Sequence, residues 1–249
     1  MNILVANWKM APDTSLQALS LAKATAKIAK TYKKNLHMVA CVPSVYLGTL
    51  QKSVKSLALG AQTVAHTLGG AETGLVSAAM LKSLGATYSI VGHSESRARG
   101  DTDALVAQQL ARLVEKKITP ILCVGEKARD AQGWYLSAIK EQLETALAAV
   151  PQAALKRMII AYEPVWAIGK DAVRGATPEE CRTMVIFIRK IVADLSNEKT
   201  AAQIPVLYGG SVDETNAHSF ITEGEANGLL VGRVSLEPKR FVKLAQSIR

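Results

Sequence analysis

Cysteine is scarce in this 249-residue sequence, and its spacing excludes two kinds of stabilisation. The three cysteines, Cys41, Cys123 and Cys181, lie far apart and form no CxxC motif or cluster with histidine. This pattern argues against a disulfide framework and against a metal site of the structural zinc type. A chain of this length buries roughly 70–75% of its unfolded surface on folding, so it needs neither.

Long apolar runs and aromatic residues are also few. No run approaches the roughly 20 residues that a membrane-spanning helix needs, and Phe, Trp and Tyr together make up 5% of the chain. The segment Met1–Lys9 lacks the charged start, apolar stretch and cleavage site of a signal peptide. We therefore expect a cytoplasmic protein with no membrane partner.

Positive charge exceeds negative charge in this chain. Lys and Arg number 30 against 21 Asp and Glu, which gives a formal net charge of +9. The basic residues are interpreted as dispersed, as in the early segment that holds Lys23, Lys27, Lys30, Lys33 and Lys34, and they form no patch in which aromatic residues alternate with basic ones. We interpret them as a solvated surface that attracts small anions, and we expect no nucleic-acid partner.

Short apolar runs alternate with helical segments along the whole chain. Their number and length give about 31 residues per repeat, the length of a strand-plus-helix unit. The runs are continuous rather than alternating, as in parallel strands buried on both faces. A doubly wound sheet is the alternative, but the even repeat favours one closed (β/α)8 TIM barrel spanning residues 1–249. The predicted strands are Ile3–Asn7, Met38–Val42, Leu57–Ala61, Tyr88–Val91, Pro120–Val124, Met158–Ala161, Val206–Tyr208 and Leu229–Val231.

Helix start signals stand between these runs. Thr177 and Glu180 have the spacing of a capping box, with Pro178 at the first helical position. Asp101 is the predicted start of a second helix, and Asp13 or Thr14 of a third.

Polar residues and glycine-bearing turns follow the predicted strands at their carboxyl ends. In a (β/α)8 barrel these ends meet at one face, where the chemistry is carried out. Each residue taken alone has an ordinary interpretation, such as a solvated lysine or a tight turn. Their common position is what indicates a site, and the residues are Asn7, Lys9, His93, Glu95, Glu163, Gly209, Gly210, Ser211, Gly232 and Arg233.

These residue types suit proton transfer next to a carbonyl. Glu163 and His93 provide a base and a group that polarises oxygen. Lys9 provides a fixed positive charge for an enediolate, and the late glycine turns provide N–H groups for a phosphate. The apolar segment Pro164, Val165, Trp166, Ala167, Ile168, Gly169 is the predicted lid. This chemistry requires no metal ion and no organic cofactor.

The motifs resemble those of the triosephosphate isomerase family in order and spacing over essentially the whole chain. They are Asn7-Trp8-Lys9-Met10, Gly92-His93-Ser94-Glu95, the segment Ala161 to Gly169, and Tyr208-Gly209-Gly210-Ser211-Val212. The resemblance implies an isomerase of glycolysis and gluconeogenesis that interconverts dihydroxyacetone phosphate and D-glyceraldehyde 3-phosphate. Another phosphosugar isomerase and a degenerate barrel retained as a binding protein are the alternatives.

The resemblance also implies a role for each site residue. Glu163 is the base, His93 the neutral electrophile, and Lys9 and Asn7 bind substrate and enediolate, with Glu95 beside Lys9. Backbone N–H groups hold the phosphate at Gly169, Ser211, Gly232 and Arg233. The chain is expected to form a homodimer through loop 3, residues 63–77, with Thr73 at the partner's site.

Three departures from the family pattern carry expectations of their own. Leu75 and Ser96 replace a Glu and an Arg that pair across the family's dimer interface, so we expect a dimer held differently and more weakly. The segment 170–176 after the lid is two residues longer, which should change lid kinetics more than chemistry. Arg233 replaces a glycine; its side chain either projects to solvent, the interpretation we favour, or adds a cation near the phosphate.

Overall fold

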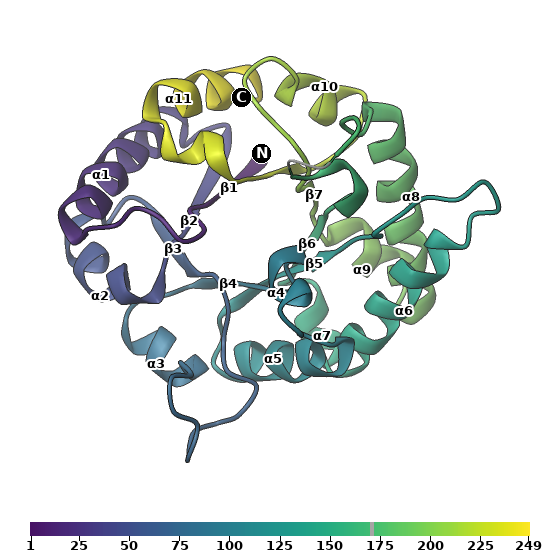
Figure 1. Ribbon diagram of the computed structural model, residues 1–249, viewed down its shortest axis with the longest axis horizontal. Coiled ribbons are helices and arrows are strands. Elements are labelled where there is room, and N and C mark those ends of the chain that lie inside the picture. The colour runs from purple at the N-terminus through teal and green to yellow at the C-terminus, as the bar shows by residue number, and fades with distance from the viewer. Residues whose placement is uncertain (170–171) are drawn as a thin grey trace.

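Eight parallel strands form a closed barrel in the computed structural model, which describes residues 1–169 and 172–249. Each strand pairs with its neighbours in chain order, and β1 closes the ring against β8 (Figure 1). The predicted fold class is confirmed. The strands are β1 (Asn2–Asn7), β2 (Leu36–Cys41), β3 (Ala58–Ala61), β4 (Tyr88–Val91), β5 (Thr119–Val124), β6 (Ile159–Tyr162), β7 (Val206–Tyr208) and β8 (Gly228–Val231).

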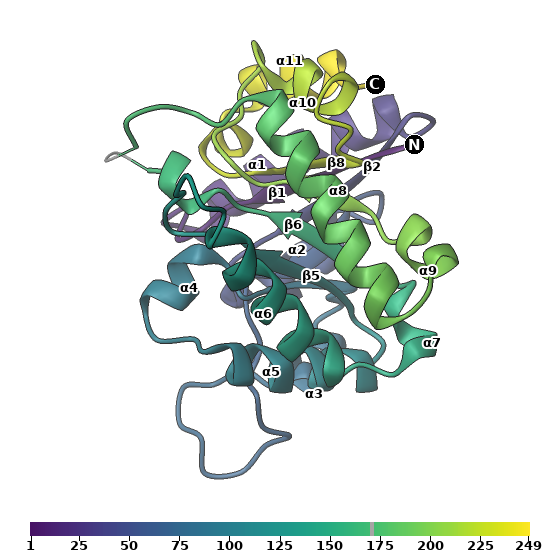
Figure 2. The same cartoon turned by 90° about the vertical axis from the view of Figure 1, so that its right-hand side faces the viewer.

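Helices surround the barrel as an outer ring (Figure 1). The chain ends lie on one side of the barrel and the segment after β6 on the other (Figure 2). The helices are α1 (Ser15–Tyr32), α2 (Ser44–Ser53), α3 (Ala78–Ser83), α4 (Ser94–Ala98), α5 (Asp103–Glu115), α6 (Tyr135–Ala148), α7 (Gln152–Leu155), α8 (Pro178–Leu195), α9 (Glu198–Gln203), α10 (Ala217–Thr222) and α11 (Pro238–Ser247), with short 3₁₀ turns η1 (Val165–Ala167) and η2 (Arg233–Leu236).

The strands are buried on both faces, as their continuous apolar runs predicted. In β1, Val5 belongs to the cluster inside the barrel, whereas Leu4 and Ala6 pack with the helices outside it. The interior cluster consists of Val5, Val39, Cys41, Ile90, Ile121, Cys123, Ile159, Ala161, Leu207 and Leu230. None of the helices among the described residues has the length and apolar character needed to cross a membrane.

Strand and helix starts differ from the prediction by one or two residues where a polar residue interrupts the pattern. β2 begins at Leu36 rather than Met38, because His37 pairs with Ile3 in the ladder and its Nε2 lies 2.7 Å from the Tyr88 hydroxyl. The helix predicted to start at Asp101 is capped by Thr102, whose hydroxyl accepts from the backbone of the third helical residue. Of Asp13 and Thr14, the two residues predicted as alternative caps of α1, Thr14 is the one that caps the helix.

The capping box at the start of α8 is confirmed and is extended by an arginine. The Thr177 hydroxyl accepts from the Glu180 N–H at 3.1 Å, and the Glu180 carboxylate accepts from the Thr177 N–H at 2.8 Å. Both terminal nitrogens of Arg174 also donate to this carboxylate, at 2.9 and 2.7 Å. These donors, Arg174 first, lower the pKa of Glu180 to about 2 against the opposing effect of burial.

This cap predicts a pH-dependent contribution to stability. Because the folded pKa of Glu180 lies below the unfolded value of about 4.3, its stabilisation is complete above that value and is lost as the pH falls toward 2. Glu180→Gln should lower the free energy of unfolding by about 1 kcal/mol at neutral pH, and the difference from the wild type should shrink in acid. Urea unfolding across the pH range measures it, with Glu179→Gln as the matched control. A difference that stays constant with pH would contradict the assignment.

Candidate active site

A cavity of about 860 Å³ opens at the carboxyl ends of the strands. It is lined by every catalytic and substrate-binding residue predicted from the sequence: Asn7, Lys9, His93, Glu95, Glu163, Gly169, Ser211, Gly232 and Arg233. The structure thus brings together side chains from β1, β4, β6, β7 and β8 that lie up to about 225 residues apart, since a closed parallel barrel collects these ends at one face.

Asn7 and Lys9 are fixed by a short polar network at the end of β1. The side-chain oxygen Oδ1 of the buried Asn7 accepts from the Lys9 N–H at 3.0 Å and from Gln62 Nε2 at 3.3 Å. Gln62 Nε2 also donates to the Lys9 carbonyl at 2.8 Å. These bonds hold Lys9 at φ 53°, a left-handed conformation that costs a non-glycine residue about 1 kcal/mol or more.

The Lys9 ammonium forms an ion pair with Glu95 at the wall of the cavity. Burial alone would raise the pKa of the Glu95 carboxyl, but the hydrogen bond and charge of Lys9, with the charge of Arg99, lower it below its usual value. Glu95 is therefore an anion at neutral pH, and it positions the cation at the cavity wall. The structure thus places Glu95 beside Lys9, where the resemblance implied it.

The imidazole of His93 is held by the first turn of α4. His93 is the residue that caps this helix, and its Nδ1 accepts from the Glu95 N–H at 3.1 Å. A backbone N–H is a donor only, so Nδ1 carries no proton and the neutral ring carries its proton on Nε2. Nε2 lies 3.1 Å from Glu163 Oε1, which places an N–H donor in the cavity.

Glu163 is 2% exposed and is held by two donors. Its Oε2 accepts from the Ser94 N–H at 2.8 Å, and its Oε1 lies beside His93 Nε2. The backbone below it needs a glycine neighbour: a Cβ atom on Gly125 would lie 1.7 Å from the Glu163 carbonyl oxygen. Close packing of β5 against β6 thus sets the position from which the carboxylate enters the cavity.

Another part of the cavity wall, the glycine wall, is made of small residues after β6, β7 and β8. Gly169, Ser211 and Gly232 line it, and the Ser211 hydroxyl donates to the Ala167 carbonyl at 3.1 Å. A Cβ atom on Gly232 would approach Lys9 Cε to 3.2 Å. Arg233 begins η2 with a negative φ, so its backbone does not need the freedom of glycine, and its exposed side chain lies at the cavity rim.

The predicted lid begins beside a buried carboxylate. Glu126 Oε1 accepts from the Trp166 indole N–H at 2.7 Å, from the Tyr162 hydroxyl at 2.8 Å and from Arg129 Nε at 2.9 Å. Burial, then the charge of Glu126, raises the pKa of Tyr162, so its hydroxyl is a donor at any ordinary pH. Glu126 therefore collects three donors and fixes the indole of the lid.

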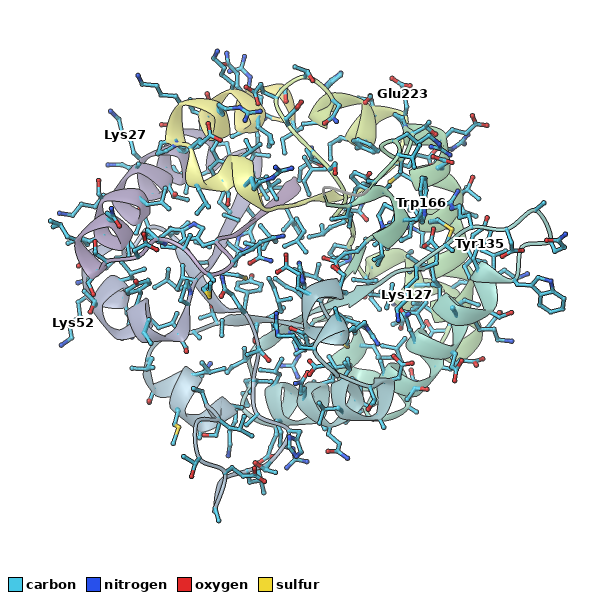
Figure 3. All side chains as sticks on the ribbon, in the orientation of Figure 1. Lys27, Lys52, Lys127, Tyr135, Trp166 and Glu223 are labelled. Atoms are coloured by element: carbon cyan, nitrogen blue, oxygen red, sulfur yellow. The ribbon has the colours of Figure 1, made fainter. Side chains whose placement is uncertain are left out.

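Two arginines contact the ring of Trp166. The guanidinium carbon of Arg129 lies 5.2 Å from the ring centroid, and that of Arg174 lies 4.7 Å from it. Figure 3 shows Trp166 on the same side of the molecule as Tyr135, whose ring is also contacted by Arg129. Arg174 belongs to the lengthened segment 170–176, of which Lys170 and Asp171 lie outside the described residues.

Several residues of this site received no role from the sequence. Gln62 and Glu126 contact residues that are distant in the chain, among them Asn7 and Trp166. Ser94 acts through its backbone N–H, which any residue but proline provides. Among residues 1–169 and 172–249, no cluster of three or more His, Cys, Asp or Glu side chains has the arrangement to hold a metal ion.

Known proteins match this chain over nearly its full length. The family model described as Triosephosphate isomerase matches residues 2–248. A triosephosphate isomerase of Azoarcus sp. (strain BH72) is 39% identical, covering 98% of each chain. One of Thiobacillus denitrificans is 38% identical over 98% of this chain and 97% of its own, and one of Aquifex aeolicus is 37% identical over 98% of each.

Arg174 should hold Trp166 in the position seen here. A cation–π contact at an exposed site is worth about 0.5–1 kcal/mol, so Arg174→Ala should increase the accessibility of the Trp166 ring roughly two- to fivefold. Acrylamide quenching in a Trp134→Phe background reports this, because Trp8 is fully buried. The matched control is Arg182→Ala, which removes an exposed arginine on α8 that, like Arg174, is paired with an acidic residue. Equal quenching in both variants would show that Arg174 does not hold the ring.

Proposed function

Because this chain belongs to the triosephosphate isomerase family, we propose that it interconverts dihydroxyacetone phosphate and D-glyceraldehyde 3-phosphate with Glu163 as the base. The isomerase activity, and with it a role in glycolysis, follows from the family. The observation that supports the residue roles best is the 3.1 Å contact between Glu163 Oε1 and a His93 Nε2 that carries the ring proton.

The proton moves from one carbon of the substrate to the next by way of Glu163. The carboxylate removes a proton from the carbon next to the carbonyl, and the electron pair of the broken C–H bond forms an enediolate. His93 Nε2–H donates to the oxygen on which negative charge develops. Glu163 then returns the proton to the neighbouring carbon. The exchange of ketone and aldehyde also requires a proton to move from the hydroxyl oxygen of the substrate to its former carbonyl oxygen. His93 Nε2 gives its proton to the former carbonyl oxygen and regains one from the hydroxyl oxygen.

Substrate binding requires Glu163 to leave its present partners. The substrate oxygen that accepts from His93 Nε2 takes the place now occupied by Glu163 Oε1. The carboxylate must also release the Ser94 N–H before it can reach carbon. Since Glu163 continues directly into the lid segment Pro164–Gly169, we propose that lid closure and the movement of the base occur together.

Lys9 and the glycine wall hold the two ends of the substrate. The Lys9 ammonium, positioned by Glu95, stabilises the enediolate, and Asn7 adds a hydrogen bond. The phosphate lies at the glycine wall, on the backbone N–H groups of Gly169, Ser211, Gly232 and Arg233. The exposed position of Arg233 at the rim adds positive charge on the side where a dianion enters.

We also propose that two copies of the chain pair through loop 3. Residues 63–77 project from the barrel body beside α3 in both views of the ribbon (Figures 1 and 2). Large apolar side chains are exposed on this loop and on the neighbouring loops and helices: Met10, Val45, Leu68, Leu75 and Met80. Such a group of exposed apolar side chains is typical of a protein–protein interface. Thr73, which is exposed on this loop, is the residue that we propose reaches the partner's site.

A cytoplasmic location is part of this proposal and is supported by the cysteines. Cys41, Cys123 and Cys181 are all buried with free thiols. Burial raises the pKa of each of these thiols, so they are inert and compatible with a reducing compartment.

Removing the base should abolish most of the activity. Glu163→Gln keeps the size of the side chain but cannot accept a proton, so kcat should fall by roughly 10²–10⁴-fold or more in a coupled assay. Glu179→Gln, on the exposed surface of α8, is the control and should leave kcat unchanged. Equal activity in wild type and Glu163→Gln would overturn the assignment of the base.

If the exposed apolar side chains on and near loop 3 form the dimer interface, a charge introduced among them should weaken the dimer. Sedimentation should show dimers at micromolar concentration, and Leu75→Asp should weaken them about tenfold or more, because burying a leucine is worth roughly 1.5–3 kcal/mol. Ile186→Asp, an exposed apolar residue on α8, should leave the association unchanged. A wild-type chain that is only monomeric at these concentrations would contradict the proposed interface.

A further inference from the structure

The excess positive charge of the chain is concentrated in one quarter of its length. Between Asp13 and Glu72 the sequence contains seven lysines and no acidic residue. All 21 acidic residues lie in the rest of the chain, with the other 23 basic ones. The net charge of +9 therefore comes mainly from this acid-free segment, which includes α1 and α2.

Six of the seven lysines of the segment line one groove. The interpretation from the sequence, that these lysines are dispersed, is therefore wrong. The groove has a volume of about 740 Å³ and lies between the carboxyl-terminal halves of α1 and α2 and the turn after α2. Its charged lining consists of Lys23, Lys27, Lys30, Lys33, Lys52 and Lys55. All six are exposed, and none forms an ion pair within the part of the chain that the structure describes.

The groove lies far from the catalytic cavity. α1 and α2 end just before β2 and β3 begin, whereas the cavity is at the opposite ends of the strands. Figure 3 shows Lys27 and Lys52 at the outer rim of the molecule over these two helices. The proposed dimer surface is also at the cavity end, so the groove stays accessible in a dimer.

The neighbouring helix does not neutralise the groove. α11 packs against α1 on the side away from α2, and it carries Lys239 and Lys243 with no acidic residue between Pro238 and Ser247. Glu237, just before α11, lies 3.4 Å from the Arg240 guanidinium. The lysines that line the groove repel one another because their charges have the same sign, so a bound polyanion would relieve the repulsion.

We propose that this groove binds linear inorganic polyphosphate. Lysine ammonium groups are compact point charges that suit successive phosphates, and a row of them in a concave surface fits an unbranched chain. Binding would release counterions from the polyanion and would weaken steeply with salt.

The other anionic partners fit less well because the groove lacks the groups that would recognise them. It contains no aromatic side chain on which exposed bases would stack, and no arginine. Its apolar lining, Ala26, Ala29 and Val54, is buried, so no apolar side chain is available to enter a lipid surface or to anchor a protein partner. A chain of phosphates without bases needs none of these groups.

Calorimetric titration with a synthetic linear polyphosphate of defined length tests the proposal. The groove variant carries Lys27→Gln, Lys30→Gln, Lys52→Gln and Lys55→Gln. The control variant carries Lys140→Gln, Lys156→Gln, Lys190→Gln and Lys199→Gln, which are exposed lysines on other helices and turns. Both variants remove four positive charges, and both should keep full isomerase activity, which shows that they are folded.

The groove variant should bind polyphosphate about tenfold or more weakly than wild type, with a smaller dependence on salt, and the control should stay within about twofold. Replacing the four groove lysines with Arg should preserve binding, because the charge remains. Equal losses in the two Gln variants would show that only net charge matters and would overturn the site. Tighter binding of duplex DNA or of phosphatidylserine–phosphatidylcholine vesicles to the same four lysines would overturn the choice of polyphosphate.

Discussion

Two backbone N–H groups in the first turn of α4 hold His93 and Glu163, the two side chains that we propose to react with the substrate. The N–H of Glu95 donates to His93 Nδ1, and the N–H of Ser94 donates to Glu163 Oε2. The first bond fixes which ring nitrogen carries the proton, and the second holds the carboxylate against that nitrogen. The acid–base pair is therefore set by main chain rather than by side chains, and it is as rigid as the β4–α4 turn that carries it.

Closure of the barrel positions the remaining groups of the site, which this turn does not hold. It places Lys9, after β1, beside Glu95, and it brings the glycine wall after β6, β7 and β8 to the same cavity. Charges at the two ends of the barrel then serve different purposes. At the carboxyl ends a lysine is paired and positioned within a cavity, whereas at the other end unpaired lysines line an open groove. The proposed catalysis at the carboxyl ends depends on the position of each group, whereas the proposed anion binding at the other end depends on the density of positive charge.

The sequence was sufficient to predict the barrel and the residues that line its cavity. Continuous apolar runs at an even repeat favour a closed barrel over a doubly wound sheet, and polar residues at the strand ends of a barrel must converge, as Asn7, His93 and Glu163 do. Contacts between distant side chains were beyond prediction, since nothing local marks Gln62 as a partner of Asn7 or Arg174 as a partner of Trp166. The lysine groove was missed for the same reason: it combines two helices that are separated by a strand.

The protonation of the His93 ring is the most direct test of this account. Nitrogen NMR of the protein with ¹⁵N-labelled histidine, assigned by comparison with a His93→Gln variant, distinguishes the two ring tautomers. The account predicts that at neutral pH Nδ1 of His93 is an unprotonated acceptor and that the proton is on Nε2, facing Glu163. A His93 ring protonated on Nδ1 would contradict it, because the Glu95 N–H would then have no acceptor and the substrate oxygen no donor.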